Sequence, residues 1–125
     1  MKRLIIVLLL GFSALLPAAS PPTAVRAEID ALLQALAKSD CEFYRNGSWY
    51  PGSKAASHLQ RKLDYFERKG LIRDAASFID AAATRSSMSG ETYQVRCPGR
   101  PAEPSAQWLS DELEQVRAGP GVARH

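Results

Sequence analysis

Serine and histidine are the residue types in this 125-residue chain that could perform acyl transfer. Three serines fall within the segment Ser86-Ser87-Met88-Ser89-Gly90, and His58 lies upstream of it. Nucleophilic catalysis needs a nucleophile, a base and a group that orients the base. Ser87 or Ser89 with His58 as the base would supply the first two, so a small serine hydrolase is one interpretation. The segment lacks the first glycine of a Gly-x-Ser-x-Gly turn, which leaves the motif incomplete.

The chain has few of the histidine and cysteine residues that a metal site would need. His58 and His125 are the two histidines, and we expect both cysteines to be consumed in a disulfide. A structural zinc site needs four ligands and a catalytic site needs three. The acidic residues Asp111, Glu112 and Glu114 are expected on the outer face of the last helix, where solvation explains them. We therefore expect no metal and no cofactor.

Aromatic residues gather in one short stretch, Cys41 to Tyr50, around the pair Asn46-Gly47. Asn-Gly is the strongest signal for a two-residue hairpin turn, because both positions need positive φ. The register of such a hairpin pairs Arg45 with Ser48, Tyr44 with Trp49 and Phe43 with Tyr50. Aromatic rings with a polar tip are typical of recognition surfaces. Trp49 and Tyr50 are therefore candidate binding residues.

The N-terminus is typical of a secretory signal peptide. Lys2 and Arg3 precede an apolar run that extends from Leu4 to Leu16 and ends before a proline. We expect residues 1–27 to be the signal peptide, with a mature start at Glu28. A start at Ala18 and an uncleaved N-terminal anchor are the alternatives.

Export also determines how the cysteines and charges are interpreted. Two cysteines in a small exported chain predict one disulfide, Cys41–Cys97. The chain has 16 basic and 13 acidic residues. Removal of residues 1–27 would take Lys2, Arg3 and Arg26 away and leave a net charge near zero. A nucleic-acid partner needs a surplus of positive charge, so none is expected. Nor do we expect stable membrane insertion after cleavage.

Apolar periodicity and turn residues predict seven elements. Helices are expected over 28–38, 54–69, 75–84 and 105–117, and strands over 41–45, 48–50 and 92–97. Ser53, Asp74 and Ser105 are expected as N-caps. The order helix–strand–strand–helix–helix–strand–helix predicts an α+β fold, in which a small three-stranded antiparallel sheet packs with about four helices. Residues 28–117 would form this single domain, and residues 118–125 would be a disordered tail.

Several short motifs together resemble a known family. They are Arg45-Asn46-Gly47 with Tyr50, Ala56 with His58-Leu59, Phe78-Ile79-Asp80, the run Ser86 to Tyr93, Val95-Arg96-Cys97 and Trp108-Leu109. This set resembles the YfeK-like family, small exported proteins of Gram-negative bacteria with unknown function. The resemblance implies a periplasmic location and no particular activity. It also groups six residues in one pattern: Arg45, Asn46, His58, Ser87, Ser89 and Tyr93.

These observations favour a non-enzymatic periplasmic module that binds a protein, a peptide or an envelope component. We expect the loop 86–90 to pack near the hairpin tip and His58, forming a polar patch beside the disulfide. The expected binding residues are Arg45, Asn46, Trp49, Tyr50, His58, Ser87, Ser89 and Tyr93. The alternatives are the serine hydrolase described above and an inhibitor of an envelope-attacking enzyme.

Overall fold

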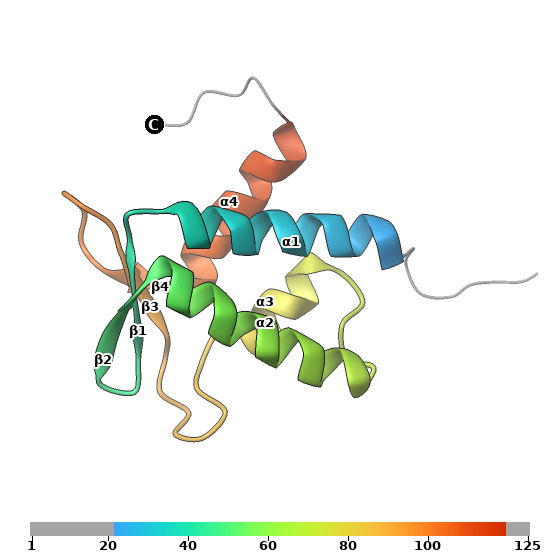
Figure 1. Cartoon of the computed structure of the whole chain (residues 1–125), viewed down its shortest axis with the longest axis horizontal. Coiled ribbons are helices and arrows are strands. Elements are labelled where there is room, and N and C mark those ends of the chain that lie inside the picture. The colour runs from blue at the N-terminus through green and yellow to red at the C-terminus, as the bar shows by residue number, and fades with distance from the viewer. Residues whose placement is uncertain (1–21, 120–125) are drawn as a thin grey trace, which may run out of the picture.

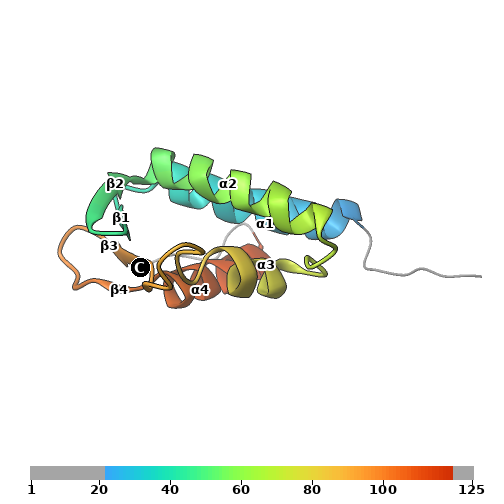
Figure 2. The same ribbon diagram turned by 90° about the horizontal axis from the view of Figure 1, so that it is seen from below.

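The computed structural model describes residues 22–119, which form four helices and one four-stranded sheet. The elements in chain order are α1 (Pro22–Lys38), β1 (Glu42–Arg45), β2 (Ser48–Pro51), α2 (Gly52–Arg68), α3 (Ala75–Ala82), β3 (Gln94–Arg96), β4 (Glu103–Pro104) and α4 (Ser105–Ala118) (Figure 1). Figure 2 shows the helices in two layers, α1 with α2 and α3 with α4, and the sheet closes one end of the stack. The α+β class is confirmed. The predicted signal peptide up to residue 21 and the tail from residue 120 lie outside the described residues.

The sheet corrects the predicted strand count from three to four. Its order is β2-β1-β3-β4, and every neighbouring pair is antiparallel. The hairpin register is the predicted one, with Asn46 and Gly47 both at positive φ. The additional strand β4 has two residues, Glu103 and Pro104, which pair with Val95 and Gln94. So short a strand shows no alternation in the sequence, and its proline is tolerated because it lies at the sheet edge.

Two helix starts and two N-caps differ from the prediction. Helix α1 begins at Pro22 and not at Glu28, and Val25 in the added turns packs against the core. Helix α2 begins at Gly52, with Pro51 and not Ser53 at the N-cap position. Helix α4 has Pro104 at this position, and Ser105 is instead fully buried in the first turn. Proline suits a helix start because its fixed φ and missing N–H cost nothing there.

Helix α3 begins as predicted, with Asp74 as its N-cap. The Asp74 carboxylate accepts from the backbone N–H of Ser77 at 2.8 Å, and Ser77 Oγ accepts from the N–H of Asp74 at 3.0 Å. This reciprocal capping box satisfies N–H groups that have no partner within the helix.

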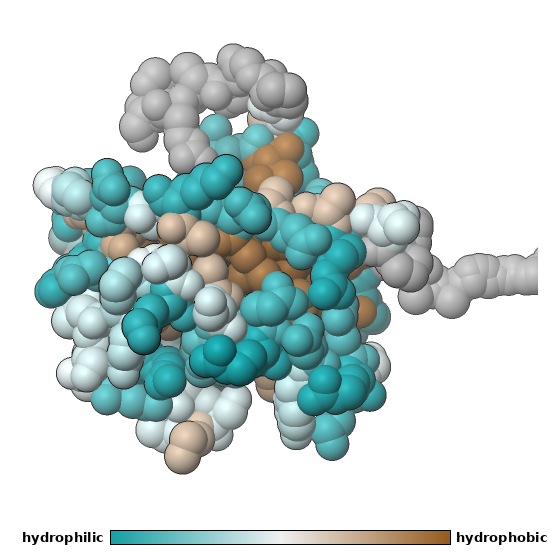
Figure 3. Space-filling model, viewed as in Figure 1, coloured by the Kyte–Doolittle hydropathy of each residue, from teal (hydrophilic) through white to brown (hydrophobic). Residues whose placement is uncertain are grey.

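The core lies between the helix layers and the inner face of the sheet. Its fully buried members come from α1, α2, α3, α4 and strands β1 and β3, and include Leu32, Phe43, Leu59, Phe78, Val95 and Leu109. On the face seen in Figure 3, apolar surface forms a band along α1 and its border with α2, surrounded by hydrophilic side chains. No helix within residues 22–119 has the length and apolar content of a membrane span.

The predicted disulfide Cys41–Cys97 is present. It joins the residue before β1 to the residue after β3, so it fastens two adjacent strands at the same end. The cysteines are 56 residues apart in sequence. Closing a loop of that length stabilises the fold by about 4 kcal/mol through the entropy of the unfolded chain.

Candidate functional site

A chain of hydrogen bonds centred on the Tyr93 hydroxyl connects α2 to the sheet. His58 and Lys62 lie one helical turn apart on α2, so both face Tyr93. His58 Nε2 lies 3.0 Å from the Tyr93 hydroxyl, and Lys62 Nζ donates to the same oxygen at 3.1 Å. Lys62 also donates to the Arg85 carbonyl at 3.0 Å. Since an ammonium can only donate, Lys62 leaves the phenol proton of Tyr93 free, and the Nδ1–H tautomer of His58 accepts that proton at Nε2.

Burial and neighbouring cations shift the protonation of this cluster. The pKa of His58 is lowered to about 4, first by burial and then by Arg45, Lys62 and Arg61. The pKa of Lys62 is lowered to about 8 by burial and by Arg45 and Arg85. At neutral pH His58 is therefore neutral, and one of its two ring nitrogens carries no proton.

The loop 86–90 is fastened to the hairpin tip. Ser89 Oγ donates to Asn46 Oδ1 at 2.7 Å and accepts from the N–H of Glu91 at 3.1 Å. Glu91 in turn accepts a hydrogen bond from the Tyr44 hydroxyl at 3.1 Å. Within the loop, Ser86 Oγ accepts from two backbone N–H groups, those of residues 88 and 89. The structure thus brings the loop, the hairpin tip and α2 together, as the sequence predicted.

These three segments surround a surface hollow of about 160 Å³, which we call the hairpin–loop hollow. Its lining residues are Arg45, Asn46, His58, Lys62, Ser86, Ser87, Met88 and Tyr93. A second hollow of about 150 Å³ shares Arg45 and His58 with it and is completed by Phe43, Tyr50, Lys54, Ala55 and Arg61. Arg45 therefore lies at the border of the two hollows, with its guanidinium carbon 5.3 Å from the centre of the Tyr50 ring.

Trp49 lies apart from the other predicted site residues. Successive strand residues point to opposite faces of a sheet, so Trp49 and its neighbour Tyr50 cannot share a surface. The Trp49 ring packs 5.3 Å from the ring of Tyr44, and the Arg96 guanidinium stacks over it at 3.9 Å. Of the predicted residues, five line the hairpin–loop hollow, Ser89 braces it, Tyr50 lines the second hollow, and Trp49 belongs to the opposite face.

The geometry around His58 differs from that of a serine hydrolase. The ring nitrogen Nε2 is paired with Tyr93, and the proton of Ser89 is directed to Asn46. No hydrogen bond joins His58 to a serine hydroxyl within the described part of the chain. A pKa of about 4 also makes His58 a weak proton acceptor at neutral pH. Ser87 is exposed and lines the same hollow as His58, and among residues 22–119 no hydrogen bond joins the two side chains.

Sequence reasoning missed the cations around His58. Lys62 lines the same hollow, Lys54 and Arg61 line the second one, and the backbone of Arg85 binds Lys62. The spacing of His58 and Lys62 already indicated one helix face. Tyr93 was named as a binding residue, but its hydrogen bond to Lys62 depends on the fold, which places the residue before β3 against that face.

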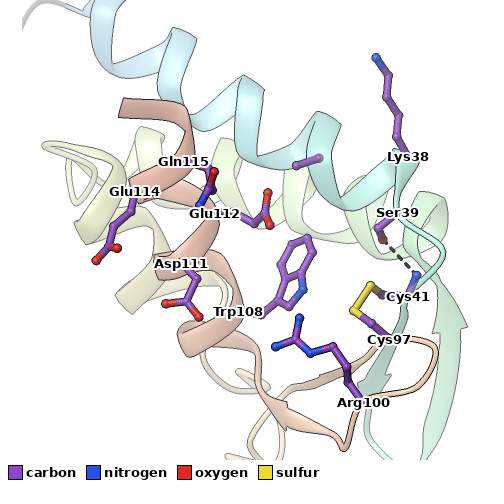
Figure 4. A pocket seen from close by; sticks show the side chains of 11 residues that line it. Lys38, Ser39, Cys41, Cys97, Arg100, Trp108, Asp111, Glu112, Glu114 and Gln115 are labelled. Carbon is purple, nitrogen blue, oxygen red and sulfur yellow. Dashed lines mark hydrogen bonds between the residues drawn. A yellow bond between two sulfur atoms is a disulfide. The ribbon is translucent and has the colours of Figure 1, made fainter. Parts of the chain in front are cut away.

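A larger groove of about 650 Å³ lies beside the disulfide. It is lined by both cysteines and by side chains of α1, α4 and the segment before β4, including Lys38, Arg100, Trp108, Asp111 and Glu112. In Figure 4 the Trp108 ring lies between Glu112 and the disulfide, with Arg100 extending towards the indole. This groove shares no lining residue with the hairpin–loop hollow.

The predicted position of the polar patch beside the disulfide is therefore wrong. Cys41 precedes the first residue of β1, and Arg45 is its last. An extended chain rises about 3.3 Å per residue, which separates these two positions by about 13 Å.

The described residues contain no group of three or more His, Cys, Asp or Glu side chains that could hold a metal ion.

Residues 23–117 match the sequence profile of DUF5329, a family of unknown function. The chain belongs to the DUF5329 family. The match spans the whole described fold except the first residue of α1 and the end of α4. No curated protein and no solved structure matches the chain. The family assignment agrees with the unknown function that the resemblance implied, and the YfeK-like name stays a resemblance.

Proposed function

We propose that this DUF5329 protein is an exported, periplasmic binding module that recognises a protein, a peptide or an envelope component. The observation that carries the proposal is the bracing of the hairpin–loop hollow. Three segments distant in sequence meet there and are joined by hydrogen bonds through Asn46, Ser89, Lys62 and Tyr93. A surface held in one conformation before binding loses little entropy when a ligand orders it further.

Export is supported by the disulfide and by the signal-like N-terminus. Disulfides persist in oxidising compartments and are rare in the cytosol. A mature start at Ala18 fits the fold better than a start at Glu28. Cleavage before Glu28 would remove Arg26, which pairs with Glu67 at 2.7 Å, and Val25, which packs on the core. Intact-mass measurement of the protein from a periplasmic extract tests both starts, and a mature chain beginning at Glu28 would contradict this choice.

Inhibition of an envelope-attacking enzyme is a second form that such binding could take. One observation favours it: the Met88 side chain is 94% exposed, in a loop whose neighbours Ser86 and Ser89 are both hydrogen-bonded. A braced loop that projects an apolar side chain suits insertion into a partner's cleft. Loss of inhibition with Met88→Ala, at unchanged stability, would distinguish this form from other binding.

The test is co-purification from periplasmic extract with the oxidised mature protein as bait. Arg45→Gln changes the hollow, Trp49→Ala changes the opposite face of the hairpin, and Arg68→Gln is a charge-matched control at the exposed end of α2. We expect a partner that Arg45→Gln loses and that both other variants retain. If only Trp49→Ala loses the partner, the binding surface is the opposite face of the hairpin. Absence of any partner that depends on these residues would overturn the proposal.

A further inference from the structure

The cations around His58 form a cluster without an acidic partner, in contrast to four arginines elsewhere among residues 22–119. Arg26, Arg96, Arg100 and Arg117 each form an ion pair with a carboxylate. Within residues 22–119, no such pair is formed by the five cations near the hollows, which are Arg45, Lys54, Arg61, Lys62 and Arg85. Neither hollow has an Asp or Glu in its lining. Positive charge is therefore concentrated and uncompensated at this place.

The polar groups of the hairpin–loop hollow are mainly donors. Lys62 uses two of its three N–H groups on protein oxygens, which leaves one for a ligand. Asn46 has its carbonyl oxygen engaged by Ser89, so its amide group remains as a donor. Arg45 adds a guanidinium that lies over the Tyr50 ring, and Ser87 adds a hydroxyl. Converging donors with two cations are the chemistry that recognises an oxyanion.

We infer that the hairpin–loop hollow binds a phosphate group, held by Arg45 and Lys62 and hydrogen-bonded by Asn46 and Ser87. This inference rests on the proposed binding function and names its ligand chemistry. Two cations match the two charges of a phosphate, whereas a single carboxylate would leave one cation uncompensated. A volume of about 160 Å³ is below the roughly 300 Å³ at which pockets enclose whole small molecules, so it suits one such group. The remainder of the ligand would extend over the second hollow, along Arg61 and Lys54.

The test is titration of the full mature protein with inorganic phosphate at constant ionic strength, followed by amide NMR and calorimetry. We expect saturable shifts at Asn46 and Ser87. Arg45→Gln and Lys62→Gln should each weaken binding about tenfold or more, since each removes a charge-assisted hydrogen bond. Arg68→Gln should change it less than about twofold, because exposed distant charges are screened. Acetate should bind at least about tenfold more weakly than phosphate. Equal weakening by all three variants, or no saturable shift at Asn46 and Ser87, would overturn the inference.

Two vesicle preparations separate a lipid headgroup from a free or soluble phosphate. Co-sedimentation with equal parts phosphatidic acid and phosphatidylcholine, lost with Arg45→Gln and absent for phosphatidylcholine alone, would identify a lipid phosphomonoester as the source. Phosphate binding without sedimentation would identify a soluble ligand. If phosphate does not bind while a partner is still captured through Arg45, the phosphate inference is wrong and the proposed function stands. If phosphate binds and no partner is captured, recognition of a macromolecule is the part that is wrong.

Discussion

Ser89 donates its hydroxyl proton to Asn46 Oδ1 over 2.7 Å and so joins the loop 86–90 to a hairpin tip 43 residues earlier in the chain. Asn46 occupies the left-handed region at φ 49, where a short polar side chain is tolerated. One residue therefore shapes the turn and holds the loop at once. Together with the bond from the Tyr44 hydroxyl to Glu91, it holds the hairpin beside the loop.

A double-mutant cycle measures that bond. Asn46→Gly preserves the turn but removes the acceptor, and Ser89→Ala removes the donor. Because the bond is exposed, we expect a coupling of about 0.5–1 kcal/mol between the two changes in urea unfolding. If the losses in free energy of unfolding of the two single variants add up to that of the double variant within about 0.3 kcal/mol, the loop is held by other contacts.

The lowered pKa of His58 makes stability depend on pH. Its folded pKa of about 4 lies below the ordinary value of 6.5, so the unfolded chain binds more protons between these two pH values. Stability that is complete above about pH 6.5 is therefore lost as the pH falls towards 4. We expect the Tm difference between pH 7.5 and pH 5 to be larger for wild type than for His58→Gln, which keeps an acceptor for Tyr93. Carboxylates titrate equally in both proteins and contribute equally to the two Tm differences. Equal Tm differences for wild type and His58→Gln would therefore contradict the lowered pKa of His58.

Gly52→Ala should destabilise the protein although alanine is the better helix former. A Cβ at position 52 would overlap the Leu36 carbonyl oxygen at the end of α1 and lie 3.0 Å from Ser39 Oγ. Because backbone would have to move, we expect a loss of about 2–3 kcal/mol in chemical denaturation. Helix propensity alone predicts a gain of up to about 1 kcal/mol. The adjacent exposed Ser53→Ala serves as control and should stay within about 0.5 kcal/mol.

Ser105→Ala should stabilise the protein. The Ser105 side chain is fully buried, and its hydroxyl has no hydrogen-bond partner among residues 22–119. An unsatisfied buried polar group costs about 1–3 kcal/mol, so its removal should raise the free energy of unfolding by about 1 kcal/mol. The backbone bond from the Ser105 N–H to the Tyr93 carbonyl is unaffected. Ser110→Ala, exposed on the same helix, should leave Tm nearly unchanged, and a lower Tm for Ser105→Ala would reveal a hidden partner.

Local signals predicted the features that depend on few residues. The Asn46-Gly47 turn determines the hairpin register, Asp74 caps α3 as expected, and a single pair of cysteines leaves one possible disulfide. The turn and the N-cap depend on a few neighbouring residues, and the disulfide could be predicted because the chain has no other cysteine. The proximity of the hairpin tip and the loop 86–90 was predicted through the family resemblance, and the structure shows its physical basis in the Ser89–Asn46 bond.

The features that were missed depend on tertiary contacts. β4 pairs only with β3, and position 52 at the start of α2 is occupied by glycine because α1 passes too close for a side chain. Ser105 looks like an N-cap in sequence but is drawn into the core. The uncompensated cations were not apparent because their pairing depends on which acidic residues the fold places nearby.

The disulfide joins positions 41 and 97, so everything between them, including the exposed loop 86–90, belongs to a covalent ring. A protease that cuts this loop would open the ring without releasing a fragment. The nicked protein would migrate as one species in a non-reducing gel and as two after reduction. Helices α1 and α4 lie outside the ring, and a cut within either of them would detach whatever lies beyond it once the packing is lost.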